Sequence, residues 1–90
     1  MEHHAVLTGP CIVTKYLGPT NHRGTRVKAS CKRDSDTNWT EIVSWDYQLD
    51  APENHFKAAQ ALVDSWPFEG LKIVARGHDH NHYYFITSCS

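Results

Sequence analysis

The sequence predicts an α+β fold in which a mostly antiparallel sheet of about five strands carries one helix on one face. Two observations predict it. Short runs rich in β-branched and aromatic residues are separated by Gly, Pro and polar turn residues, as strands are. One central run instead repeats its apolar residues at helical spacing, giving the order β-β-β-α-β-β. A chain of 90 residues is expected to form one domain, residues 1–90.

The first two strands are expected to form a hairpin. "CIVTKYLG", residues 11–18, ends at a Gly-Pro turn signal, and "GPTNHRG", residues 18–24, has the composition of a loop. "TRVKASCK", residues 25–32, alternates small or apolar side chains with polar ones, which is the period of a half-buried strand. The predicted inward set is Thr25, Val27, Ala29 and Cys31, and the outward set is Arg26, Lys28, Ser30 and Lys32.

Three further strands are expected from the same kind of pattern. "WTEIVSWDY", residues 39–47, follows a polar turn at 33–38 and precedes the helix. "LKIVA", residues 71–75, and "YYFIT", residues 83–87, follow the helix. The predicted apolar face of the third strand consists of Trp39, Val43, Trp45 and Tyr47, with Glu41 near its edge.

The helix is expected to begin after Asp50 and to end at Trp66-Pro67. Asp50 is an N-cap residue, Pro52 suits the first turn and Glu53 completes a capping box. Proline disfavours helical geometry in the residue before it, which predicts the end. The predicted apolar stripe is Phe56, Ala59, Leu62, Val63 and Trp66, and the solvent side is Glu53, His55, Lys57, Gln60 and Asp64.

A run of three histidines separates the last two strands. In an extended strand His78, His80 and His82 would point to one face about 6.5–7 Å apart, near enough to share a metal ion, with Asp79 as a further ligand or a partner of the ligands. A polar segment that follows a glycine and separates two apolar runs is first of all a hairpin connection. We therefore expect a solvated turn and no cofactor, with the three histidines as the candidates if a metal binds.

Composition favours an intracellular protein. Cys11, Cys31 and Cys89 form no CxxC pair and are too few for a disulfide framework, so we interpret them as small buried residues. The N-terminus lacks the pattern of a signal peptide, and no apolar run approaches the roughly 18 residues of a membrane span. These features predict a cytoplasmic protein with no membrane partner.

Charge is divided unevenly along the chain. Residues 1–33 hold most of the basic side chains and a single acid, whereas residues 34–90 hold most of the acids. The basic hairpin 15–33 surrounds a Gly-bounded loop and has Tyr16 beside it. Such a hairpin suits phosphate groups or an acidic protein surface. The alternative is that the basic and acidic halves of the chain pair with each other across strands. The basic block contains Lys15, His22, Arg23, Arg26, Lys28, Lys32 and Arg33.

No catalytic constellation is present in the sequence. It has no P-loop, no GxSxG and no HExxH motif, and its Ser, Cys and acidic residues follow no triad pattern. His22, in the basic loop, and His55, on the helix, are expected to be solvated. The sequence therefore predicts a binding protein that is not an enzyme.

Two blocks carry a resemblance to a known group of proteins. "TKYLGPTNHRGTRVKA", residues 14–29, and "ENHFKAAQAL", residues 53–62, resemble segments of small uncharacterised proteins of bacteriophages and other mobile elements. The resemblance covers most of the chain from Val13 onwards and includes the Trp45-Asp46-Tyr47 element. That group has a Gly-rich loop where this chain has "RGHDHNH", which argues against a shared metal role for the histidines.

The resemblance implies an accessory phage protein that acts in the host cytoplasm. By analogy, it would bind a host protein or ribonucleoprotein complex, as an anti-defence inhibitor of the anti-CRISPR kind does. The alternatives are a small nucleic-acid-binding domain that uses the basic hairpin, a metal-binding protein, and pairing of two copies through an exposed sheet edge. The expected partner contacts are Tyr16, His22, Arg23, Arg26, Lys28 and Tyr84.

Overall fold

The computed structural model describes residues 9–32, 38–65 and 70–89 and has the predicted order of elements. These elements are β1 (Cys11–Leu17), β2 (Arg26–Lys32), β3 (Asn38–Ser44), α1 (Ala51–Asp64), β4 (Leu71–His78) and β5 (Tyr83–Cys89). The strands form one antiparallel sheet in the order β3-β2-β1-β5-β4. The predicted α+β fold is confirmed. The expected turn at 33–38 lies outside the described residues except for Asn38, which begins β3, and the expected helix end at Trp66-Pro67 also lies outside them.

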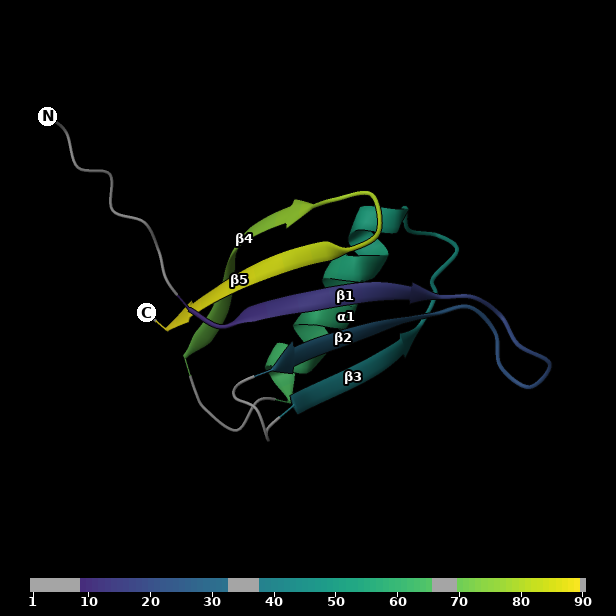
Figure 1. Cartoon of the computed structure of the whole chain (residues 1–90), viewed down its shortest axis with the longest axis horizontal. Helices are drawn as coiled ribbons and strands as arrows, with labels where there is room; N and C mark the ends of the chain where they lie inside the picture. The colour runs from purple at the N-terminus through teal and green to yellow at the C-terminus, as the bar shows by residue number, and fades with distance from the viewer. Residues whose placement is uncertain (1–8, 33–37, 66–69, 90) are drawn as a thin grey trace, which may run out of the picture.

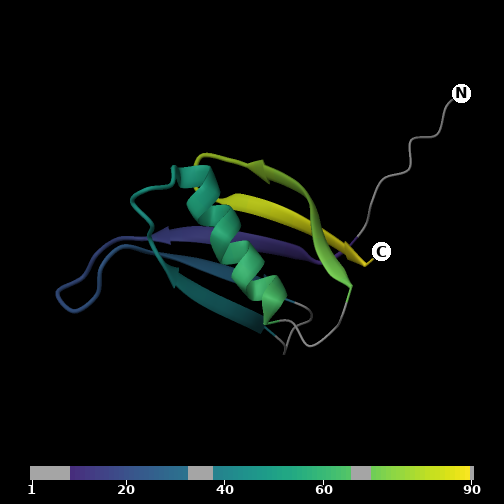
Figure 2. The same ribbon diagram turned by 180° about the vertical axis from the view of Figure 1, so that it is seen from behind.

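The single helix packs across one face of the sheet (Figures 1 and 2). Alternate strand residues face it, and Ile12, Val27 and Phe85 lose all their exposed surface there. The helix contributes a buried stripe of small and apolar residues: Ala58, Ala59, Leu62 and Val63. The strand alternation predicted for β2 is confirmed, because Val27, Ala29 and Cys31 are all buried. Thr25 lies just before the strand.

The start of the helix forms as its sequence predicts. Asp50 is the N-cap, and its side chain accepts a hydrogen bond of 3.0 Å from the backbone N–H of Glu53. The prediction that His55 is solvated is wrong, because this residue keeps only 4% of its surface exposed. Positions 55, 58, 59 and 62 share one helical stripe. The polarity of the imidazole, rather than its position, suggested the solvent side.

The third strand is shorter than predicted and ends at Ser44. Tyr47, expected on its buried face, belongs to the following turn and keeps 82% of its surface exposed. A backbone hydrogen bond of 3.1 Å from Leu49 N–H to the Asp46 carbonyl closes this turn. The side chain of Asn54 also holds it from the helix: its oxygen accepts from Asp46 N–H at 2.7 Å, and its nitrogen donates to the Asp46 carbonyl at 2.9 Å.

The histidine run forms the predicted turn, but β4 extends beyond its predicted end at residue 75 to His78. Asp79 closes the turn because its carboxylate accepts from the backbone N–H groups of Asn81 and His82 at 2.8 and 2.7 Å. The three histidines therefore do not alternate along one strand. Among the described residues, no group of three or more His, Cys, Asp or Glu side chains is arranged to hold a metal ion.

Of the two cysteines whose side chains the structure describes, one differs from its prediction. Cys31 is buried on the helix side of β2, but Cys11 is exposed. Cys11 on β1 lies opposite Ile86 on β5, and both residues are on the face that α1 does not cover. Tyr84, two residues before Ile86, lies on the same face. The period of two along β1 puts Ile12 into the core and Cys11 out of it.

Candidate anion-binding face

The sheet face opposite α1 is rich in cations. Lys15 on β1 lies directly opposite Lys28 on β2, and Arg26 lies between Leu17 and Ser44 on the same face. Lys72, opposite Ser88, extends this set to β4. We define the basic face as Lys15, Arg26, Lys28, Lys32 and Lys72.

Carboxylates are missing from the strand positions of this face. The one acidic residue in the described strands is Glu41, and its register opposite buried Ala29 puts it on the helix side. Like charges placed directly opposite each other destabilise a sheet. No cation of the basic face takes part in the described ion pairs, which are Lys57–Asp46, Arg76–Glu53 and His82–Asp79. The described part of the fold therefore keeps a set of cations that the described acids do not neutralise.

Tyr84 provides an aromatic ring on the same face. It lies between Val13 on β1 and Gly77 on β4, and the glycine has no side chain to cover it. The Tyr84 hydroxyl donates a hydrogen bond of 2.7 Å to the Asp79 carboxylate. That bond and the backbone N–H donors of the turn lower the pKa of Asp79 to about 2, and the same bond raises the pKa of Tyr84. The ring is thus fixed at its hydroxyl end.

The loop between β1 and β2 carries His22 and Arg23, both exposed. Thr20 organises it: its backbone N–H donates to the Arg23 carbonyl at 2.7 Å, and its hydroxyl accepts from Arg23 N–H at 3.0 Å. The loop extends beyond the end of the sheet (Figure 1). Arg23 therefore lies near Arg26, the first residue of β2, at the same end of the sheet.

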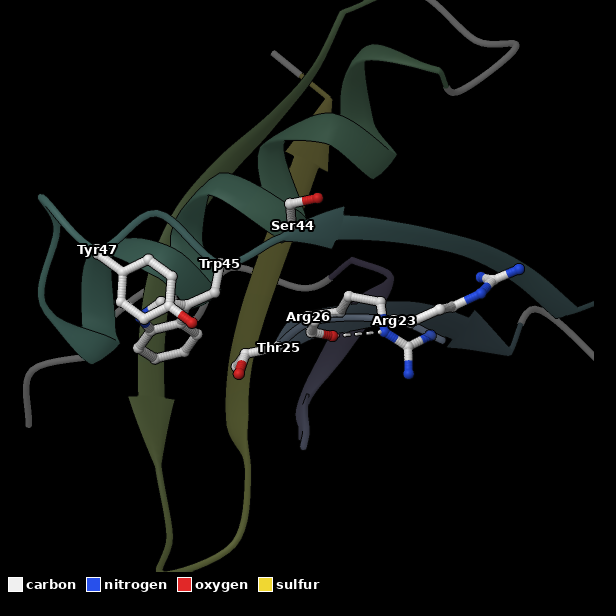
Figure 3. Close-up of a pocket in the computed structure, with 7 residues that line it drawn as sticks. Arg23, Thr25, Arg26, Ser44, Trp45 and Tyr47 are labelled. Carbon is white, nitrogen blue, oxygen red and sulfur yellow. Dashed lines mark hydrogen bonds between the residues drawn. The ribbon is translucent and has the colours of Figure 1, made fainter. Parts of the chain in front are cut away.

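A pocket of about 450 Å³ opens between this loop and the turn after β3. A hydrogen bond of 3.0 Å from Trp45 N–H to the Thr25 carbonyl brings the two segments together. The pocket is lined by Arg23, Gly24, Thr25 and Arg26 on one side and by Ser44, Trp45 and Tyr47 on the other. Figure 3 shows the two aromatic rings apart from the two guanidinium groups, with Thr25 between them.

The predicted contact residues separate into two groups. Arg26, Lys28 and Tyr84 lie on the basic face, with Arg23 and His22 in the loop at its end. Tyr16 does not join them, because its register opposite Val27 points it to the helix side. There its ring meets Trp45 edge to face, with centroids 5.5 Å apart.

A buried polar pair was missed by sequence reasoning. The Thr14 hydroxyl and the Nδ1 atom of His55 lie 2.7 Å apart, and the ring centroids of His55 and Tyr83 are 4.2 Å apart. Burial, with a smaller contribution from His82, lowers the pKa of His55. A hydroxyl beside an imidazole is the pattern of an activated nucleophile, but Thr14 has no exposed surface. The pair therefore joins β1 to α1 and does not meet a substrate in this conformation.

Comparison with known proteins adds no assignment: no protein family, no curated protein and no solved structure matches the chain. Within the described ranges, no helix has the length and apolar character needed to cross a membrane.

Proposed function

We propose that the protein is a non-enzymatic nucleic-acid-binding protein that holds the phosphates of a strand on its basic face. One observation carries this proposal: the charged strand residues of that face are all cations, and none is paired with an acid of the described fold. Neutralising phosphates releases counterions from a nucleic acid, which is the main source of affinity for such surfaces.

The arrangement favours a nucleic acid over an acidic protein. Side chains at alternate positions of a strand repeat about every 6.6 Å. Arg26, Lys28 and Lys32 therefore form one row along β2, interrupted at Ser30, which suits an extended charged polymer. Tyr84, fixed by Asp79 and flanked by Gly77, adds a ring on which a base can stack. Asp50, Glu53 and Asp46 lie at the start of α1 and in the turn before it, away from the basic face, whereas Asp79 beside Tyr84 is an acidic residue at its edge. The excess of cations on the basic face would turn that face towards a polyanion.

The test is binding of a fluorescent single-stranded oligonucleotide, followed by anisotropy over a range of salt concentrations. The double variant Lys15→Gln/Lys28→Gln should bind more weakly, and its plot of log affinity against log salt should be shallower by about 1.4, or about 0.7 for each lost phosphate contact. Lys57→Gln is the matched control, because Lys57 is exposed on α1 and faces Asp46. Wild-type protein that binds an acidic peptide but no oligonucleotide would refute the nucleic-acid proposal.

The resemblance to phage and mobile-element proteins supports a narrower proposal. The bound strand would belong to a host ribonucleoprotein complex, and binding would inhibit that complex, as anti-defence proteins do. A pull-down from bacterial lysate, with and without nuclease, tests it. The narrower proposal requires the complex to be captured by wild-type protein, to be lost after nuclease, and to be lost with the Lys15→Gln/Lys28→Gln variant. Capture that survives both treatments would contradict it.

A further inference from the structure

The pocket beside the basic face contains an exposed aromatic ring on a rigid turn. Tyr47 keeps 82% of its surface exposed. Its backbone neighbours are nevertheless fixed: Asp46 binds the buried Asn54 side chain through both its N–H and its carbonyl, and Gln48 N–H donates to the Asp46 carboxylate at 2.9 Å. The backbone that carries the ring is therefore ordered before a ligand binds, and only the side-chain torsions of Tyr47 are left to order when a ligand stacks on it.

Cations line the other side of the same pocket. Arg26 is fixed by a hydrogen bond of 3.2 Å from its Nε to the Gly24 carbonyl, which leaves the terminal nitrogens of the guanidinium free to bind an anion. Arg23 also lines the pocket from the loop, and Figure 3 shows its guanidinium extending away from the two aromatic rings. Arg26 also belongs to the basic face, so the pocket continues that face at the loop end of the sheet.

We propose that this pocket takes one unpaired nucleotide of the bound strand, with its base on the ring of Tyr47 against the wall formed by Trp45 and its phosphates on Arg23 and Arg26. The inference rests on the proposed nucleic-acid function and names the form of nucleic acid. A base inside a duplex has both faces stacked, whereas an unpaired base can turn out onto an aromatic side chain. The volume of about 450 Å³ lies within the range of small-ligand sites. The pocket therefore makes the protein selective for single strands.

The experiment compares a single-stranded oligonucleotide of about 12 nucleotides with the duplex of the same sequence. Tyr47→Ala should weaken binding of the single strand roughly 5- to 100-fold, which is the usual effect of losing one stacked base. Tyr47→Phe keeps the ring and should bind within about twofold of wild type. The duplex, which cannot supply the unpaired base, should bind all three proteins equally. Because the ring is exposed, the thermal unfolding of both variants should match wild type, which checks the fold.

The outcomes separate this inference from the function on which it rests. Unchanged single-strand affinity in Tyr47→Ala, together with weak binding by Lys15→Gln/Lys28→Gln, would overturn the pocket assignment and leave the basic face in place. Equal loss of single-strand and duplex affinity in Tyr47→Ala would also overturn the inference. Wild-type protein that binds neither nucleic acid would refute the proposed function itself.

Discussion

Replacing Lys28 by Glu should strengthen the fold and weaken binding at the same time. Lys28 lies directly opposite Lys15 across β1 and β2, so the substitution turns a repulsive cross-strand pair into an attractive one. Such pairs contribute about 0.2–1 kcal/mol each. Both side chains are partly exposed and solvent screens them, so we expect a gain of about 0.5 kcal/mol in the free energy of unfolding. In a domain of this size, that corresponds to a rise of about 2–4 °C in the midpoint of thermal unfolding.

Binding should change in the opposite direction. Lys28→Glu removes one phosphate contact and adds a repulsive charge, so affinity for a single-stranded oligonucleotide should fall and the salt slope should decrease by at least about 0.7. Circular dichroism melting and fluorescence anisotropy measure the two effects on one protein preparation. Lys32→Glu is the control, because Lys32 faces Asn38 rather than a cation. It should weaken binding without raising the melting temperature. A Lys28→Glu protein that melts lower and binds as wild type does would refute the reasoning.

Three further predictions concern buried and turn-forming groups. Burial lowers the pKa of His55, so below pH 6.5 the unfolded chain binds a proton at this residue that the folded chain does not. The free energy of unfolding should therefore fall as the pH decreases below 6.5. Denaturant titrations of His55→Gln should no longer show this dependence. Asp79 has a folded pKa of about 2 against an ordinary 3.8, so its stabilising contribution should be present above pH 3.8 and lost towards pH 2. In Tyr84→Phe, which removes the largest cause of that shift, an NMR titration should show the Asp79 pKa closer to 3.8. Asn54→Ala should lower the free energy of unfolding by about 2–4 kcal/mol, because it leaves backbone groups of the turn before α1 unpaired. The control is Gln60→Ala on the exposed side of the helix, which should change this free energy by less than about 0.5 kcal/mol.

Local patterns were sufficient to predict the elements and part of the site. The alternation along β2 places Arg26 and Lys28 on one face without any knowledge of the neighbouring strands, because the side-chain period of a strand is two. The Asp50 cap likewise depends only on residues close in sequence. The order of charged residues along the chain also indicated that basic and acidic side chains would be separated in space, since residues 1–33 hold most of the basic residues.

Features that depend on long-range contacts could not be predicted in this way. Tyr47 reads as the end of a strand, and the side chain of Asn54, a buried helix residue, holds the turn that exposes it. His55 reads as a polar surface residue, and its burial depends on the Thr14 hydroxyl that meets it across the fold. The helical spacing of positions 55, 58, 59 and 62 was the signal in the sequence that could have predicted the burial of His55.

The most direct test of the central claim is a map of where a polyanion binds. A single-stranded oligonucleotide would be titrated into the ¹⁵N-labelled protein, and the backbone amide shifts would be followed residue by residue. The account predicts that the shifts concentrate on β1 and β2, on the loop at 18–25 and around Tyr47, and that they diminish in Lys15→Gln/Lys28→Gln. Shifts that concentrate on α1, or an unchanged spectrum at saturating oligonucleotide, would contradict it.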